Sequence, residues 1–285
     1  MSDSQQPVLS ILLPVRNEEM NLRVMLRIIQ TVLESPHEVL VIHDTADDRS
    51  VPVVREAQPK YPGLRLVHNR LGRGVINAVR AGVAEARTNI ITVLCADDTG
   101  PVLVVDDMFA LIREGCDFVS CTRYAYGGRR LGGSRIGGLF SRTANWLFYY
   151  LARSPFTDAT TGLKMFRREM FDRMQLESRP IGWAVAFEMA IKAQHLGGKL
   201  GEVPLVSIDR LFGGQSSFRL GPWLVEYMRW FLWGLRRTLV SRNWRRPPIR
   251  IRVPIFYQSE ALAPLADPGL EPAVLSEPHE AAKNS

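Results

Sequence analysis

Short apolar runs alternate with amphipathic stretches as far as Arg123, and this rhythm constrains the fold more than any other feature. The apolar runs have the length of buried strands, and the stretches between them repeat apolar residues at helical spacing. We expect strands at Val8–Leu13, Glu38–His43, Leu64–Val67, Ile90–Leu94 and Phe118–Cys121. Strands that alternate with helices predict an α/β fold with a mostly parallel sheet flanked by helices.

The rhythm changes after Arg123. A Gly- and Arg-rich stretch, Tyr124–Gly138, is expected to form a mobile loop. Beyond it we expect helices at Leu139–Ala152, Trp183–His195 and Pro222–Val240, and a strand at Val203–Ile208. From Pro254 the chain is rich in Pro, Ala and Glu, which is typical of disorder. We therefore divide the chain into a main domain (1–220), an Arg- and Trp-rich amphipathic region (221–253) and a disordered tail (254–285).

Acidic residues follow three of the expected strands. Glu18 follows the first strand, Asp44 with Asp47 and Asp48 follows the second, and Asp97-Asp98 follows the fourth. The carboxyl ends of parallel strands share one edge of the sheet, where open α/β sheets bind ligands. Carboxylates accept base N–H groups, and a hard divalent cation that holds a diphosphate prefers oxygen ligands. The acids therefore predict a nucleotide-sugar site, although each one alone also suits a helix cap or a turn.

Composition narrows the classes of protein. The hydrophobic content of 46% supports a sizeable core, and the formal net charge of +7 favours anionic partners. The three cysteines lie in or beside apolar runs, as expected for reduced, buried thiols in a cytosolic protein. The first strand is followed by Pro14-Val15-Arg16-Asn17, so the dinucleotide-binding G-x-G-x-x-G motif is missing there. The sequence also lacks a G-x-x-x-x-G-K phosphate loop, an H-E-x-x-H zinc motif and a G-x-S-x-G nucleophile elbow.

The order and spacing of the motifs resemble glycosyltransferase family 2, whose members are inverting enzymes with the Rossmann-like GT-A fold. Within that family the chain looks most like the dolichol-phosphate mannosyltransferase branch, which uses polyprenyl phosphates. The resemblance covers roughly Val8 to Arg219. It is carried by Pro14–Glu18, Asp44 with Asp47 and Asp48, Gly72-Arg73-Gly74, Asp97, Cys121–Arg123, Asp158–Phe166, Glu188, Glu202–Pro204 and Arg210–Ser217.

The resemblance implies a role for each matching residue. For the nucleotide sugar it implies contacts from Pro14, Arg16, Glu18, Asp44, Arg73, Asp97, Arg123 and Arg210, with Arg219 as a further phosphate ligand. For the acceptor phosphate it implies Arg135, Ser141 and Ser217. Asp97, helped by Asp98, would hold a Mg²⁺ or Mn²⁺ ion that bridges the donor diphosphate. Asp158 would orient the sugar or the metal site.

One position departs from the family pattern. The family has D-x-D where this chain has Cys95-Ala96-Asp97, so a thiol replaces the first acid. A neutral thiol is a poor ligand for a hard cation. Asp98, or Thr99 through a water molecule, is expected to compensate. A catalytically decayed protein that docks on membranes stays open as an alternative.

The chemistry of the acceptor decides whether a base is needed. A phosphate acceptor is already an anion, so positioning and a metal that neutralises the leaving diphosphate suffice. A sugar hydroxyl would require a carboxylate base, for which Glu188 and Asp158 are the candidates. Alternatively, Glu188 is a buried acid tied to a Lys or Arg.

The segment Pro222–Leu235 combines bulky aromatics with a following arginine cluster. One helical face carries Trp223, Tyr227, Trp230 and Phe231, as expected for a helix that lies in a lipid headgroup layer. Leu139–Ala152 is a second candidate of this kind. The alternative is a core helix with solvated arginines. We expect a peripheral protein on the cytoplasmic face of the membrane.

The sequence thus predicts a metal-dependent inverting glycosyltransferase of cell-envelope biosynthesis. It would take GDP-mannose or a UDP-sugar and transfer the sugar to dolichyl or undecaprenyl phosphate. The enzymatic alternative is a family 2 transferase that acts on a hydroxyl acceptor in polysaccharide or glycolipid synthesis. Nucleic-acid binding through the arginines between Arg219 and Arg252 is the remaining alternative, but that block contains no recognisable nucleic-acid module, so we expect no nucleic-acid partner.

Overall fold

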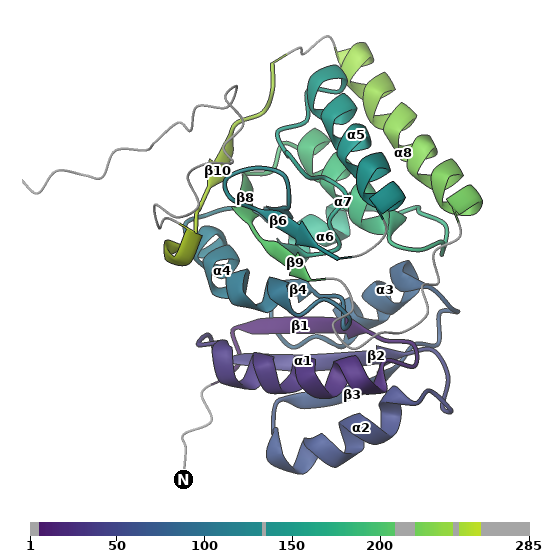
Figure 1. Cartoon of the computed structure of the whole chain (residues 1–285), viewed down its shortest axis with the longest axis vertical. Coiled ribbons are helices and arrows are strands. Elements are labelled where there is room, and N and C mark those ends of the chain that lie inside the picture. The colour runs from purple at the N-terminus through teal and green to yellow at the C-terminus, as the bar shows by residue number, and fades with distance from the viewer. Residues whose placement is uncertain (1–5, 133–134, 209–219, 242–244, 258–285) are drawn as a thin grey trace, which may run out of the picture.

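The computed structural model describes residues 6–132, 135–208, 220–241 and 245–257 (Figure 1). Their central feature is an eight-stranded sheet with the strand order β10-β8-β5-β7-β4-β1-β2-β3. Its strands are β1 (Leu9–Pro14), β2 (His37–His43), β3 (Leu64–His68), β4 (Ile90–Val93), β5 (Phe118–Thr122), β7 (Lys164–Arg167), β8 (Leu200–Pro204) and β10 (Ile249–Ile251). The helices are α1 (Glu19–Val32), α2 (Ser50–Ala57), α3 (Val75–Glu85), α4 (Val105–Arg113), α5 (Arg135–Leu151), α6 (Arg168–Met174), α7 (Ala184–His195) and α8 (Leu220–Ser241).

The sheet is parallel except at one strand. β1 pairs in parallel with β2 and β4, β2 with β3, and β8 with both β5 and β10. β7 runs antiparallel between β4 and β5. Neither β7 nor β10 is expected from the sequence. Both are short and carry Lys or Arg, so their apolar signal is weak, and pairing with neighbouring strands forms them.

Helices cover both faces of the sheet, as the alternating rhythm predicts. One hydrophobic cluster joins the sheet to α1, α2 and α4, and a second joins its other face to α3, α6 and α7. α5 and α8 lie side by side outside α7 at the periphery (Figure 1). Because the carboxyl ends of β1, β2 and β4 lie at one edge, the acids that follow them share that edge.

Three expected boundaries shift. The stretch Tyr124–Gly138 contains β6 (Arg129–Leu131), which pairs in parallel with β9 (Val206–Ile208). The strand expected at Val203–Ile208 is therefore divided between β8 and β9. Ile255–Tyr257 forms a 3-10 turn inside the range expected to be disordered, and Tyr257 packs against the core. Pro254 is also described and is buried, whereas residues 258–285 lie outside the described residues.

α8 turns its aromatic face toward the protein. Trp230 is 1% exposed, and Gly234 packs closely against Phe148 of α5. Tyr227 stacks on Phe187 of α7. The prediction that this face lies in a headgroup layer is therefore wrong, and the core-helix alternative is right for it. The amphipathic pattern looks the same in both cases, because it does not say which surface covers the apolar face. Of the helices in the described ranges, none is both long and apolar enough to cross a membrane.

Candidate functional site

A small pocket opens where β1 and β2 end. Its volume is about 120 Å³, and it is lined by Arg16, Asn17, Asp44, Thr45, Asp47, Asp48 and Arg73. Its lining includes both arginines and carboxylates, so it offers partners for both phosphate oxygens and nucleoside donors. The pocket unites residues from three separate loops that the sequence patterns assign to one nucleotide site.

Asp48 ties two of these loops together. Its carboxylate oxygens each lie 3.1 Å from the backbone nitrogen of Asn17, which donates to them, and the Ser50 N–H donates at 2.8 Å. Asn17 adopts a positive φ of 56°, a conformation that asparagine tolerates better than most residues. Ser50 Oγ in turn accepts the Glu18 N–H at 2.9 Å. Asp48 is buried, so it holds the pocket wall in place.

Asp44 fixes the glycine loop that carries Arg73. The amide of Asn69 donates to one Asp44 oxygen at 2.7 Å, and the Gly74 N–H donates to the other at 3.4 Å. Asn69 also donates to the Gly72 carbonyl at 2.7 Å. Gly72 and Gly74 have φ values of 94° and 118°, which favour glycine. Asp44 therefore helps to place Arg73 at the pocket. This positioning comes in addition to the predicted role of Asp44 as an acceptor for a base N–H group.

Asp97 and Asp98 follow β4 but differ in their surroundings. Both oxygens of Asp98 accept hydrogen bonds from β9, one from the Ser207 hydroxyl at 2.5 Å and one from the Ile208 N–H at 2.9 Å. Asp98 thus ties the motif to β9. Asp97 is only half-buried, at the sheet edge shared with the pocket. A β-carbon built on Gly162 would lie 2.8 Å from Cys95 Sγ, so the thiol packs against protein.

These residues fit one kind of metal site. Among the residues that the structure describes, no three His, Cys, Asp or Glu side chains gather into a ready-made cation site. Mg²⁺ is usually held by one or two carboxylates together with substrate phosphates and water. The carboxylate of Asp97 would meet that requirement as a single protein ligand, and the hydrogen bonds to β9 give Asp98 a structural role.

Asp158 and Arg123 form a buried pair at the end of β5. Arg123 Nε lies 2.6 Å from one Asp158 oxygen, and Arg123 Nη2 lies 3.0 Å from the other. Asn145 Nδ2 and the Thr160 hydroxyl also donate to Asp158, each at 3.0 Å. Burial opposes ionisation of Asp158, yet the Arg123 guanidinium outweighs it and lowers the carboxyl pKa below its ordinary value. Asp158 is therefore a charged anchor for Arg123.

Ser141 lies beside this pair. Its hydroxyl oxygen accepts from Arg123 Nη2 at 3.3 Å and from the Tyr124 hydroxyl at 2.9 Å, and it lies 2.9 Å from Thr160 Oγ1. The family resemblance implies that Arg123 binds the donor phosphates and that Ser141 binds the acceptor. In the structure these two residues are in direct contact. Arg210, Arg219 and Ser217 lie outside the described residues, and only the backbone of Arg135 is described.

Glu188 is buried in α7 and is fully engaged by neighbours. Its two oxygens accept the N–H groups of Glu177 and Ser178 at 2.6 and 2.8 Å. Lys192 Nζ lies 2.8 Å away, one helical turn along. These contacts match the alternative of a buried acid tied to a lysine.

Two buried ionisable residues received no role from the sequence. Glu202 accepts the N–H groups of Thr157 and Asp158 at 2.9 and 3.2 Å, and burial raises its pKa to about 7. Lys164 Nζ donates to Ser120 Oγ at 2.7 Å and to the Ala159 carbonyl at 3.2 Å, and burial lowers its pKa to about 8. Together they clamp the backbone on both sides of Asp158. Lys164 lies in the Asp158–Phe166 motif and Glu202 in the Glu202–Pro204 motif. The local sequence does not indicate which residues they contact.

The comparisons with known proteins agree with this architecture. Residues 10–175 match the family model described as glycosyl transferase family 2. The match covers more than half of the chain, so the chain belongs to glycosyl transferase family 2. The family predicted from the motifs is thereby confirmed.

Individual relatives refine the picture. A dolichol-phosphate mannosyltransferase of Pyrococcus furiosus is 26% identical over 77% of this chain and 61% of its own length. Glycosyltransferase AglD of Haloferax volcanii is 26% identical over 69% of this chain and 32% of its own length. The chain thus spans less than two thirds of either relative. The first of them belongs to the branch that the motifs resemble.

Solved structures confirm the fold class. Glucosyl-3-phosphoglycerate synthase from Mycobacterium tuberculosis, solved with Mg²⁺ and UDP, matches with a TM-score of 0.61 at 17% identity. The match covers 81% of this chain and 80% of that one. The same enzyme solved with Mn²⁺, UDP-glucose and phosphoglyceric acid gives a TM-score of 0.61 at 18% identity. The predicted GT-A-type α/β fold is therefore confirmed.

Proposed function

We propose that this protein transfers a sugar, with inversion, from a nucleotide-diphosphate sugar to a polyprenyl phosphate at a membrane surface. The observation that carries the proposal is the shared sheet edge, where the pocket of Arg16, Asp44 and Arg73 meets the strand that delivers Asp97. GDP-mannose and UDP-sugars are the donors we propose. The UDP and UDP-glucose bound to the structural relatives support a nucleotide donor.

The pocket residues would bind the donor. Asp44, and Glu18 beside the pocket at the end of β1, would accept nucleoside N–H and hydroxyl groups, while Arg16 and Arg73 would offset the negative charge of the diphosphate. A Mg²⁺ or Mn²⁺ ion beside Asp97 would supply further charge neutralisation to the leaving diphosphate. Mg²⁺ and Mn²⁺ in the structural relatives support this choice.

The engagement of the candidate bases favours a phosphate acceptor. Asp158 is paired with Arg123, and Glu188 is paired with Lys192, so neither carboxylate is presented as a base. An acceptor phosphate oxygen needs no base, because it is already an anion. It would attack the anomeric carbon as the bond from that carbon to the diphosphate breaks, and the electron pair leaves with the nucleoside diphosphate. Arg123 and Ser141 are the residues we propose to hold the acceptor phosphate.

The outer faces of α5 and α8 support contact with a membrane. Both helices expose apolar side chains although their inner faces are already packed. These side chains are Leu139, Phe140, Trp146 and Tyr150 on α5, and Leu224, Val225, Met228 and Leu232 on α8. Exposed Arg236 and Arg237 on α8 add positive charge suited to anionic headgroups. We therefore propose a peripheral protein on the cytoplasmic face.

A transfer assay with matched acceptors tests the proposal. The purified protein is incubated with Mn²⁺ and radiolabelled GDP-mannose or UDP-glucose. Each donor is offered undecaprenyl or dolichyl phosphate, the corresponding polyprenol, or phosphoglyceric acid. We expect a labelled lipid product only with the polyprenyl phosphates. Transfer to the polyprenol would instead favour the hydroxyl-acceptor alternative. Absence of transfer from either donor to any acceptor would contradict the proposed function.

A further inference from the structure

Residues 175–183, which we call the bridge segment, connect α6 to α7 and are pinned to α7 at their start. Glu188 accepts two of its backbone N–H groups, as described above. Lys192 Nζ donates to the Gln175 carbonyl at 2.6 Å and lies 3.2 Å from Glu177 Oε1. The segment contains little regular structure, so its position depends on such contacts.

The middle of the bridge segment is held by α8. Glu226 is 1% exposed, and its Oε1 accepts the Arg179 N–H at 3.0 Å. Arg229 Nη1 donates to the same oxygen at 3.0 Å and approaches the Glu177 carbonyl at 3.4 Å. The Trp223 ring covers Gly182 so closely that a side chain at that glycine would collide with it. A buried carboxylate is therefore committed to one backbone N–H of this segment.

The opposite side of the bridge segment touches the candidate donor site. A β-carbon built on Gly74 would lie 2.5 Å from Pro180 Cβ, so Pro180 packs directly against the glycine loop. Gly74 is also the residue whose N–H donates to Asp44. At the end of the segment, the Trp183 ring would lie 3.1 Å from a β-carbon on Gly162, the same position that meets Cys95.

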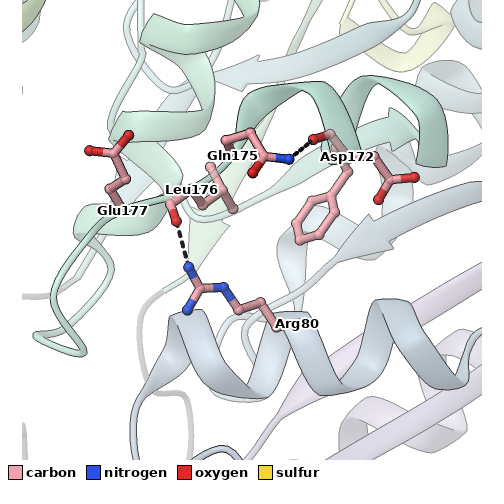
Figure 2. Close-up of a pocket in the computed structure, with 6 residues that line it drawn as sticks. Arg80, Asp172, Gln175, Leu176 and Glu177 are labelled. Carbon is pink, nitrogen blue, oxygen red and sulfur yellow. Dashed lines mark hydrogen bonds between the residues drawn. The ribbon is translucent and has the colours of Figure 1, made fainter.

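A second contact joins the bridge segment to α3, the helix that begins after Gly74. Arg80 of α3 points into a cavity of about 330 Å³ and donates to the Leu176 carbonyl at 2.5 Å (Figure 2). The segment thus contacts α3 through Arg80 and the preceding glycine loop through Pro180. A shift of the segment would displace the loop that carries Arg73.

We propose that Glu226 is a positioning residue for nucleotide binding, acting through the bridge segment on the Gly74 loop. The inference rests on the proposed nucleotide-binding function of the pocket. A charged acceptor holds an N–H more tightly than a neutral one, and the held residue, Arg179, directly precedes Pro180. α8 is then coupled to the donor pocket although it contributes no pocket-lining residue among those described.

The test compares two buried acids by isothermal titration with UDP and with GDP, each in the presence of Mn²⁺. We expect Glu226→Gln to weaken binding of the nucleotide that binds the wild type by about tenfold. Glu38→Gln is the matched control. Glu38 is equally buried and pairs with Arg65 at 3.0 Å and with the Arg87 N–H at 2.6 Å, but it lies at the opposite end of the strands. The Glu38→Gln variant should have a lower melting temperature and an unchanged nucleotide affinity.

Exposed Pro180 provides a second variant that does not disturb the core. We expect Pro180→Ala to weaken nucleotide binding, and the double variant with Glu226→Gln to lose no more than the stronger single variant, since both act through one segment. Full additivity would overturn the inference, as would an unchanged affinity in Glu226→Gln. Failure of the wild type to bind either nucleotide would overturn the proposed function as well, so the two failures are distinguishable.

Discussion

The Asp158 carboxylate is fully buried and lies 2.6 Å from Nε of Arg123, which is largely buried just after β5. Asp158 thereby directs the Arg123 guanidinium toward Ser141, instead of presenting a carboxylate to the solvent. Arg123 and Ser141, for which the sequence predicts separate roles, are therefore in contact with each other. We interpret these two residues as the acceptor side of the site.

Replacing Asp158 by Asn should destabilise the protein strongly. The change leaves the Arg123 charge buried without its partner, which typically costs about 3–5 kcal/mol. Urea denaturation measures the free energy of unfolding. The comparison is Glu56→Gln, which breaks an exposed ion pair with Arg23 and should have no measurable effect. An Asp158→Asn variant as stable as the wild type would show that the pair does not anchor the fold.

Gly74→Ala should impair both stability and nucleotide binding. Gly74 has a φ of 118°, and the β-carbon of an alanine there would collide with Pro180. We therefore expect the free energy of unfolding to fall by about 1–3 kcal/mol. Because the loop carries Arg73, nucleotide affinity should also fall, as titration calorimetry would reveal. Gly115→Ala separates the two effects, since Gly115 has a φ of 101° but a β-carbon added there would meet no atom within 4 Å. Equal nucleotide affinities in the two variants would contradict the assigned role of the loop.

Glu202 should make folding stability depend on pH. Burial raises its pKa from 4.5 to about 7, so the folded protein retains a proton that the unfolded chain has released in this range. The stabilisation from this group is complete below pH 4.5 and is lost as the pH rises toward 7. In Glu202→Gln, the decline in unfolding free energy over this window should therefore be smaller than in the wild type. Identical pH profiles from urea titrations would refute the assignment.

The exposed face of α8, and not its tryptophan face, should govern membrane binding. The triple variant Val225→Ser, Met228→Ser and Leu232→Ser removes apolar surface from one outward face. It should weaken flotation with anionic liposomes and leave the melting temperature unchanged. Trp230→Ala should instead destabilise the fold by about 3–5 kcal/mol, because the ring is buried. Unchanged flotation of the triple variant would argue against this docking face.

The regular part of the fold follows from local sequence patterns. Parallel strands buried on both faces are nearly continuous apolar runs, so β1, β2 and β5 are visible in the sequence. β7 is not visible, because a four-residue strand that begins at Lys164 has no such run. The sequence also does not predict which way the aromatic face of α8 points. An aromatic stripe on a helix can pack against a protein core or lie against a lipid surface.

Candidate site residues divide in the same way. Asp44 and Asp97 are predictable, because a carboxylate that follows a parallel strand must reach the sheet edge. The hydrogen bonds of Asp98 to Ser207 and Ile208 depend on a strand far along the chain, which local spacing does not encode. The structural role of Asp98 therefore could not be predicted from the sequence around it.

A calorimetric titration of UDP and GDP, each with and without Mn²⁺, into the wild type and Asp97→Asn probes the metal-assisted nucleotide site itself. We predict that Mn²⁺ tightens binding of at least one nucleotide to the wild type. We also predict that this gain disappears in Asp97→Asn while the melting temperature is retained. The same Mn²⁺-dependent gain in both proteins, or its absence from the wild type, would contradict the assignment of Asp97 to a metal-assisted nucleotide site.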